Sequence, residues 1–296
     1  MLDQSSVLKL CFLLFFISPA LANTKFSDEP GSCMIIGDPD VYGIGIRLGY
    51  YMQWAAVLFA TWIAPAQTKT ARTASNIITV AVYANTFRGA THGGLIAAEW
   101  YIVFWMVFIL PIGNWPSSTK LLRNSTSSMA IMLLLWAMIL LAEPWLYFKG
   151  LETGLKEGCQ VKVFLFTPIN IYSKGWWTFQ KVMSCFGVLS AAIFLSGAIT
   201  LLAWGVFGSW NEPDMGDDDA VDAEPAIAGG LTFFQIGVGA FSIPFIELTI
   251  KANNITFPTA NLTDSGQLIP FLVGLFTIMA VFGSGVKRLI RHVKND

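Results

Sequence analysis

A small set of ionisable and amide side chains stands within or beside the long apolar runs of this sequence. Its members are Arg47, Arg88, His92, Glu99, Glu143, Glu247 and Gln267. In lipid a charged side chain costs about 2.5–3.5 kcal/mol at the centre of a spanning helix, so it needs water or a partner of opposite charge. Arg47 lies inside the apolar run that follows Asp40, a predicted helix N-cap, and reaches Ala64. We expect Glu99 to be its first partner and Glu143 its second.

Three roles fit this set of side chains. Three carboxylates and two arginines at similar depth would form a water-accessible vestibule that receives an ion or a small solute. Long side chains near helix ends also snorkel to the interface and anchor the helix there. The third role is a structural ion pair between helices. We favour the vestibule, and the other two roles stay open.

The composition points to lipid as the solvent of the chain. Hydrophobic residues make up 54% of the sequence and charged residues only 12%, which is typical of a membrane protein and not of a soluble domain. The net charge of −1 argues against nucleic acid binding, which needs a basic surface. The two histidines, His92 and His292, are too few for a polyhistidine metal centre, so we predict no metal and no cofactor.

Residues 1–22 are typical of a secretory signal peptide. A basic residue precedes a short apolar run, and Ala20 and Ala22 supply the small residues of a cleavage site. We expect the mature chain to begin near Asn23, with residues 23–40 on the lumenal or extracellular side. An uncleaved signal anchor is the alternative, but the apolar run is short for a bilayer span.

Seven stretches are candidates for membrane spans, so we predict an all-α transmembrane bundle over residues 41–290. They are residues 41–64, 74–88, 94–112, 127–148, 177–207, 229–250 and 268–289. The second is the weakest candidate because it is short and carries Asn76, Asn85 and Arg88; it either spans, re-enters or lies on the surface. Glycines in the first and last stretches predict close helix contacts.

The predicted topology places the N-terminus outside and the C-terminus in the cytosol. Lysine and arginine counts are similar on the two sides with six or seven spans, so the positive-inside rule does not decide. The glycosylation sequons at Asn254 and Asn261 face the lumen only with seven spans. Cys33 and Cys159 share the oxidising side only with seven, and the tail, residues 291–296, is then cytosolic. We predict seven spans in a membrane of the secretory pathway, with the plasma membrane favoured.

The cysteine inventory predicts one disulfide bond. Cys11 leaves with the signal peptide and Cys185 lies inside a span, so Cys33 and Cys159 remain as the pair. Two free thiols are the alternative. The bond would tie the N-terminal segment to the glycine-containing external loop of residues 149–175.

Residues 211–228 form an acidic segment between the fifth and sixth predicted spans. A segment this polar cannot fold alone, so we predict a cytosolic loop that is available to a cytosolic partner. A solvated linker is favoured there over a divalent-ion site.

No constellation in the sequence has the spacing of a known catalytic site. The sequence contains no Walker-type glycine loop, no Gly-x-Ser-x-Gly and no His-Glu-x-x-His. Seven spans invite a comparison with rhodopsins, but the last predicted span has no lysine in its middle for a Schiff base, since Lys287 stands at its end. We therefore predict no catalytic residues and favour a protein without enzymatic activity.

Two segments carry a resemblance to known proteins. DPDVYGIGIRLGYYMQW at residues 38–54 and SGQLIPF at residues 265–271 resemble segments of multi-spanning membrane proteins of filamentous fungi. The resemblance covers most of the mature chain. That family has no established activity, so the resemblance implies the topology and no mechanism.

The sequence supports three functions. In the favoured one, a channel or transporter receives an ion or small solute in the external vestibule. In the second, a receptor-like sensor binds a small ligand there, and the acidic loop or basic tail contacts a cytosolic partner. In the third, a membrane scaffold uses its polar residues for helix packing alone. The lipid bilayer is a partner in all three functions and nucleic acid in none.

Overall fold

The apolar runs of the sequence become long helices in the computed structural model of the protein. The structure describes residues 34–91, 95–112, 115, 126–151, 159–207, 225–257, 262 and 264–295. The predicted signal peptide, residues 1–22, lies outside the described residues, as does most of the predicted acidic segment, residues 211–224.

Twelve helical elements and one β-hairpin follow one another along the described residues. The helices are α2 (Pro39–Tyr42), α3 (Ile44–Ile63), the 3₁₀ turn η1 (Pro65–Gln67), α4 (Thr68–Thr91), α5 (Ala97–Phe104), the π-helical segment η2 (Trp105–Ile109), α6 (Leu110–Ile112), α8 (Thr126–Trp145), the π-helical segment η3 (Leu146–Gly150), α9 (Lys174–Phe207), α10 (Pro225–Ala252) and α11 (Ser265–Asn295). The hairpin is β1 (Lys162–Leu165) and β2 (Thr167–Asn170). The chain is therefore mostly helical, with the hairpin as a small departure from the all-α prediction.

Four helical segments of the described residues are long and apolar enough to cross a bilayer. They are Thr126–Gly150, Lys174–Trp204, Phe233–Ala252 and Ser265–Arg291. Ala97–Ile112 is a shorter apolar helix. The seven-span count and the sides on which the termini lie stay predictions.

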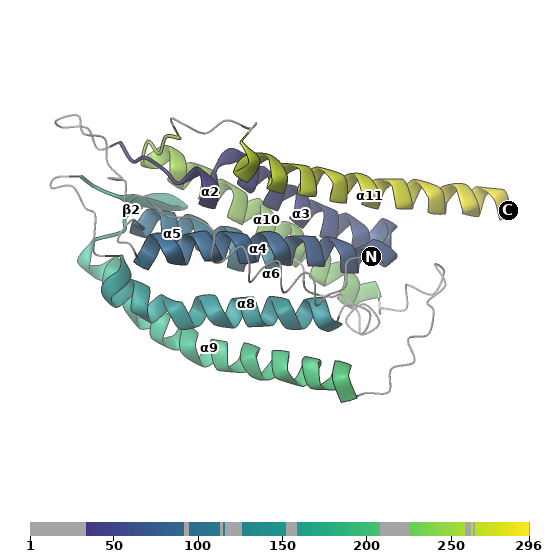
Figure 1. Ribbon diagram of the computed structural model, residues 1–296, viewed down its shortest axis with the longest axis horizontal. Helices are drawn as coiled ribbons and strands as arrows, with labels where there is room; N and C mark the ends of the chain where they lie inside the picture. Colours follow the sequence, from purple (N-terminus) through teal and green to yellow (C-terminus); the bar gives the residue numbers. More distant parts are fainter. Residues whose placement is uncertain are drawn as a thin grey trace.

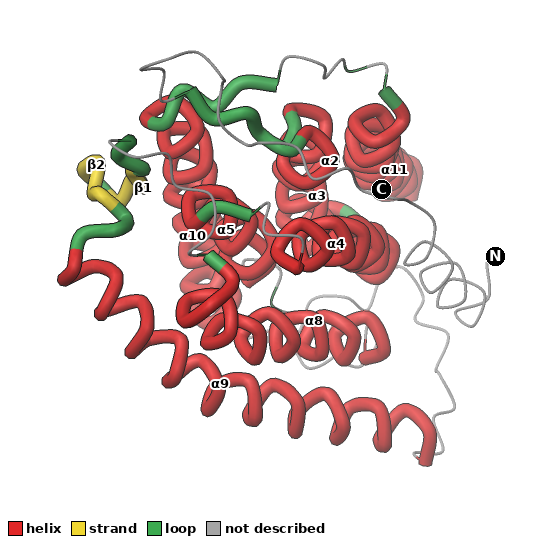
Figure 2. Tube along the Cα trace, turned by 60° about the vertical axis from the view of Figure 1, so that its left-hand side comes forward, coloured by secondary structure: helices red, strands yellow, loops and turns green. Residues whose placement is uncertain are grey.

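The helices form a layered bundle (Figures 1 and 2). α3 and α11 lie side by side at one face, α8 and α9 at the opposite face, and α4, α5 and α10 between them. Only 17% of the most apolar window in Lys174–Trp204 and 11% of that in Ser265–Arg291 is buried. Because apolar surface of this extent is unfavourable in water, these outer faces fit a lipid environment.

The weakest predicted span is part of a long central helix. α4 extends beyond the predicted residues 74–88 to Thr68–Thr91, and its buried side chains include Arg72, Asn76 and Thr79. Asn76 donates to the backbone oxygen of Ser128 on α8 at 2.8 Å. Its low hydropathy follows from its position, since a helix surrounded by protein can bury polar groups that find partners.

Small residues bring α3 and α11 into close contact. A Cβ added to Gly49 would lie 2.5 Å from the Pro270 backbone oxygen, and one added to Gly274 would lie 2.8 Å from the Gly49 backbone oxygen. Gly45 faces the backbone of Gln267 in the same way. The predicted role of Gly45 and Gly49 as helix-contact residues is confirmed.

The β-hairpin docks on the C-terminal end of α10. Phe166 forms its turn with a positive φ of 61°. The Asn253 side chain accepts from the Lys162 backbone nitrogen at 2.7 Å and donates to the Lys162 backbone oxygen at 2.5 Å. Thr249 accepts from the Phe164 backbone nitrogen at 3.0 Å. Part of the predicted external loop, residues 149–175, is thus a hairpin that is hydrogen-bonded to the end of α10.

The predicted covalent modifications are only partly covered by the described residues. Cys185 is a free, exposed cysteine, whereas Cys159 is not free. Cys33, its predicted partner, lies outside the described residues, so their disulfide stays a prediction. Asn254 is exposed, in a turn with a φ of 48°, and Asn261 lies outside the described residues. Glycosylation of both stays a prediction.

Candidate functional site

A break in the first helix organises the polar residues around it. Gly43 has an extended backbone, with φ −61° and ψ 167°, and separates α2 from α3. The prediction of Asp40 as the N-cap is wrong, because Asp38 caps α2 and accepts the Asp40 backbone N–H at 3.0 Å. Backbone carbonyls that leave a helix at such a break need other donors. The Tyr42 carbonyl finds one in the Arg47 side chain. The Pro39 carbonyl accepts from the Gly43 backbone N–H at 3.0 Å and also from a side chain of this site.

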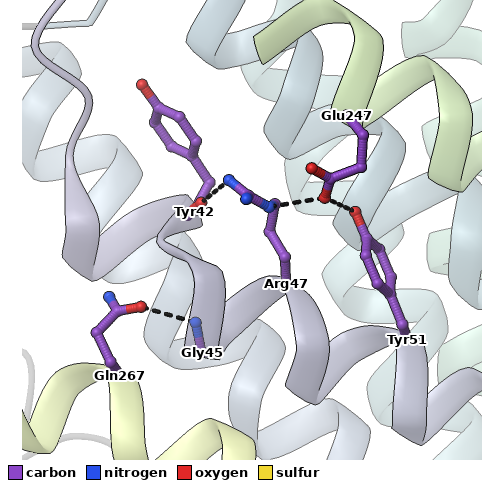
Figure 3. A network of polar contacts seen from close by, with 6 residues as sticks. All are labelled: Tyr42, Gly45, Arg47, Tyr51, Glu247 and Gln267. Atoms are coloured by element: carbon purple, nitrogen blue, oxygen red, sulfur yellow. Dashed lines mark hydrogen bonds and ion pairs between the residues drawn. The ribbon is translucent and has the colours of Figure 1, made fainter. Parts of the chain in front are cut away.

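Arg47 lies one turn past the break and has partners on two sides (Figure 3). Its Nε forms an ion pair with Glu247 Oε1 on α10 at 2.9 Å. Its Nη1 donates to the Tyr42 backbone oxygen at 3.0 Å. The guanidinium carbon also lies 5.7 Å from the centre of the Phe257 ring. Arg47 is 5% exposed, so these groups replace water around a buried charge.

Glu247 has a second partner on α3. The Tyr51 hydroxyl donates to the same Oε1 at 2.8 Å. The Glu247 side chain is 41% exposed, against 7% for Arg47. The ion pair therefore has a closed, cationic side and an open, anionic side.

The prediction that Glu99 is the first partner of Arg47 is wrong, and so is Glu143 as the second. Glu99 is fully buried and holds the start of α5. It accepts from the Tyr42 hydroxyl at 2.7 Å and from the Ile96 backbone nitrogen at 3.2 Å. Similar depth in the bundle does not decide a pairing, because the two side chains must also stand on facing helix surfaces.

Gln267 joins α11 to both sides of the break. Its Oε1 accepts from the Gly45 backbone nitrogen at 2.9 Å (Figure 3), and its Nε2 donates to the Pro39 backbone oxygen. Gln267 is 1% exposed. One buried amide thus satisfies a donor of α3 and an acceptor of α2.

We refer to these residues together as the α2–α3 network. Its members are Pro39, Tyr42, Gly45, Arg47, Tyr51, Glu99, Glu247 and Gln267. Of the other predicted site residues, Arg88 lies half-buried in the last turn of α4 and His92 lies outside the described residues. The predicted vestibule itself stays a prediction.

The sequence analysis missed the two tyrosines of the network. Tyr51 stands four residues after Arg47 on α3, so both face the same side of the helix. That spacing is readable in the sequence and would have pointed to a shared partner. Tyr42 gave no comparable signal, because its role depends on the break that follows it.

Asp40 is an acidic residue of α2, which precedes the apolar helix α3. Burial raises the pKa of Asp40 above its usual value of 3.8, and the nearby carboxylates of Asp38 and Asp264 raise it further. Among the described residues, no group of three or more His, Cys, Asp or Glu side chains is arranged to hold a metal ion.

Glu143 belongs to a separate cavity of about 370 Å³. The cavity lies between α5 and η2, the end of α8 with η3, and α9, and the end of β1 also borders it through Leu165. Nine of its sixteen lining residues are aromatic. Glu143 is 8% exposed, and a Cβ on Gly187 of α9 would lie 3.2 Å from its Oε2. We call this space the Glu143 cavity.

No family model, curated protein or solved structure matches the chain. The resemblance to fungal membrane proteins therefore stays a prediction, and the geometry alone carries the functional argument.

Proposed function

We propose that the protein carries a small anion across a membrane, and that the Arg47–Glu247 pair is the site that the anion engages. The observation that carries this proposal is the 2.9 Å ion pair between a buried arginine and a half-exposed glutamate on neighbouring helices. A buried charge among apolar helices is costly to keep, and such charges commonly mark solute pathways.

The break between α2 and α3 supports the same proposal. Discontinuous helices place free backbone groups beside charged side chains, which is how many transporters build a solute site. Here the Tyr42 carbonyl accepts from Arg47, beside Gly43, which interrupts the helix. The π-helical segment η2 adds a second irregular stretch within the short apolar helix Ala97–Ile112. Single-turn π-helices are frequent at functional sites.

An anion can use the pair by competing with the Glu247 carboxylate for the Arg47 guanidinium. Arg47 donates to the Tyr42 backbone oxygen, and its carboxylate partner Glu247 is the more exposed member of the pair. An anion that approaches from the Glu247 side can replace the Glu247 carboxylate on the guanidinium, which is always charged and offers several N–H donors. The released Glu247 keeps the Tyr51 hydroxyl as a donor.

The proposal includes the seven-span topology and a place in the secretory pathway, with the plasma membrane favoured. α3 and α4 run alongside the four apolar helices in Figure 1, which supports counting them as spans. Together with Ala97–Ile112 they bring the number to seven. The signal peptide, the Cys33–Cys159 disulfide and glycans at Asn254 and Asn261 belong to the same proposal.

Reconstitution in liposomes tests transport. Purified full-length protein is placed in vesicles that contain a halide-sensitive dye, and chloride uptake is followed with and without a membrane potential. We expect uptake that falls by about tenfold or more in Arg47→Gln, since one lost charge-assisted contact is worth about 1.5–3 kcal/mol. Arg88→Gln makes the same charge change outside the network and should keep the native rate. Equal rates in empty vesicles and protein vesicles would overturn the proposal.

Glycosidase treatment tests the topology independently. Asn254→Gln and Asn261→Gln should each lose one glycosidase-sensitive mass step if the loop between α10 and α11 is lumenal. A fully unglycosylated protein with an antibody-accessible C-terminus on intact cells would exclude the seven-span arrangement.

A membrane scaffold is the second candidate, and a specific observation favours it. Arg47, Glu99 and Gln267 are buried and have protein partners at hydrogen-bonding distance, as expected for a network that joins helices. If no anion crosses in any assay while Arg47→Gln lowers the melting temperature of the protein, the scaffold replaces the transporter.

A further inference from the structure

The Glu143 cavity is a second place where a charge is buried, and it is built differently from the α2–α3 network. The lining residues come from six elements: α5, η2, α8, η3, β1 and α9. Aromatic rings dominate the wall. Its volume of about 370 Å³ lies in the range of small-molecule pockets, which is about 300–1,000 Å³.

Glu143 lines this cavity, and its carboxylate has no protein partner among the described residues. Its side chain forms no hydrogen bond and no ion pair with the residues that the structure describes. The residue is nonetheless 8% exposed. A carboxylate withdrawn from water to this extent needs a compensating cation or donor.

A second polar group of the wall lacks a partner. The indole Nε1 of Trp176 is buried and has no acceptor among the described residues. Buried Trp N–H groups normally find one. Glu143 is thus the anionic acceptor that borders the cavity, and Trp176 adds to the wall a buried donor without an acceptor.

The ring-lined surface suits a cation with an apolar body. Ammonium groups are attracted to the faces of Trp, Tyr and Phe, and aromatic cages recognise quaternary ammonium ligands. A cation–π contact of this kind is already present on α9. Lys181 Nζ lies 5.0 Å from the centre of the Phe148 ring and 5.7 Å from that of the Trp177 ring. Gly187 packs against the carboxylate on one side, since an added Cβ there would lie 3.2 Å from Glu143 Oε2, and the aromatic wall lies around it.

We propose that the Glu143 cavity binds an organic ammonium ion, with the Glu143 carboxylate as its counter-ion and the aromatic wall around its alkyl groups. The ammonium group belongs either to a free amine or quaternary amine, or to the choline head group of a lipid. This site is separate from the Arg47–Glu247 pair and does not depend on the transport proposal.

Choline and its neutral tert-butyl analogue, which replaces the ammonium nitrogen by carbon, provide the test. Their affinities are measured by calorimetry and by tryptophan fluorescence on full-length protein in a maltoside detergent without choline lipids. We expect choline to bind about tenfold or more tightly than the neutral analogue, because a desolvated cation–π contact alone is worth about 2 kcal/mol.

Two variants locate the site. Glu143→Gln keeps the shape of the side chain and removes its charge, so choline affinity should fall by about tenfold or more, while the aromatic rings still favour choline over the neutral analogue. Glu247→Gln makes the same change in the α2–α3 network and should leave choline affinity unchanged. If Glu143→Gln does not fold, the comparison of choline with its neutral analogue on the native protein decides alone.

Nanodiscs distinguish the two sources of the ammonium group. In phosphatidylglycerol discs choline should bind freely. In phosphatidylcholine discs, loss of choline binding assigns the site to a lipid head group, whereas unchanged binding assigns it to a free organic cation. Equal affinity for choline and the neutral analogue, or native affinity in Glu143→Gln, would overturn the proposal.

Discussion

The Arg47–Glu247 pair and the Glu143 cavity bury charge in opposite ways. Arg47 has Glu247, the Tyr42 carbonyl and the Phe257 ring around it. Glu143 has aromatic rings and space around it, and no ion pair among the described residues. Both lie in a protein whose outer helices are apolar enough to face lipid.

The difference teaches how to separate a buried charge that protein groups compensate from one that only a ligand can compensate. A buried charge whose partners are protein groups stabilises one arrangement of helices, and removing one partner leaves the other uncompensated. A buried charge that borders a cavity lowers the stability of the empty protein, and only a ligand compensates it. The two regions should therefore respond to substitution with opposite signs.

The largest expected effect is loss of the buried arginine. Arg47→Met keeps an unbranched apolar stem but removes the ion pair with Glu247 and the donor to Tyr42. We expect it to destabilise the folded protein by about 3 kcal/mol, the lower end of the range for breaking a buried pair, because the Glu247 side chain is 41% exposed. Reversible unfolding in mixed micelles, followed by tryptophan fluorescence, measures the change.

The double variant Arg47→Met/Glu247→Gln sharpens this prediction. Without the arginine, a neutral amide is easier to leave in place than a carboxylate, so the double variant should recover part of the lost stability. A double variant that is less stable than Arg47→Met would show that the pair does not couple α3 to α10.

The helices were more predictable from the sequence than the partners of their polar side chains. Hydropathy located the apolar runs of α8, α9, α10 and α11, because each helix of this kind contacts lipid or an apolar neighbour along its length. Hydropathy underestimated the length of α4, because its polar residues face other helices. No local pattern states that α10 rather than α5 supplies the carboxylate to Arg47, since that depends on how helices distant in sequence come together.

The polar site was predictable in its members but not in its arrangement. The free-energy cost of polar side chains in lipid led us to select Arg47, Glu247 and Gln267 from the sequence. In the structure all three lie around the helix break at Gly43, between α2 and α3. The break itself depends on Gly43 and on the donors that reach it from α11. The Glu143 cavity arises from packing among six elements, so its existence cannot be read from any one of them.

The α3–α11 contact should show the second-largest effect. Gly49→Ala directs a Cβ to within 2.5 Å of the Pro270 backbone oxygen, which is rigid, so we expect a loss of about 2 kcal/mol from overpacking. In the Glu143 cavity, Gly187→Ala meets the movable end of the Glu143 side chain at 3.2 Å instead and should cost less. Melting temperatures of the two variants, measured side by side, test the contrast.

Gly237→Ala is the matched control for both glycine variants. Nothing lies within 4 Å of the Cβ that it adds, and alanine favours a helix over glycine by about 1 kcal/mol, so stability should rise slightly. Equal losses at Gly49 and Gly237 would mean that the close approach of α3 and α11 does not hold the bundle together.

Glu143→Gln should change stability in the opposite direction from Arg47→Met. It removes a buried charge that has no ion-pair partner among the described residues, so we expect the ligand-free protein to gain about 1 kcal/mol. The gain should disappear in saturating choline, because the native protein then receives the binding free energy that the variant has lost. A loss of stability in choline-free detergent would show that protein groups compensate the Glu143 charge, as they do for Glu247.

The smallest expected effect is at Asp40 of α2. It tests whether the charge of this carboxylate is also uncompensated. Burial, with Asp38 and Asp264 nearby, raises the pKa of Asp40 above 3.8, so its charge opposes folding at neutral pH. The folded protein should be destabilised as the pH rises through this raised pKa, and the penalty should vanish below about pH 4. Asp40→Asn should therefore raise the melting temperature at pH 7 and have no effect at the acidic end. Because the Asp40 side chain is exposed, solvent screening keeps the gain below about 1 kcal/mol. A difference between the native protein and Asp40→Asn that stays constant with pH would assign the gain to hydrogen bonding by the amide instead of to removal of charge.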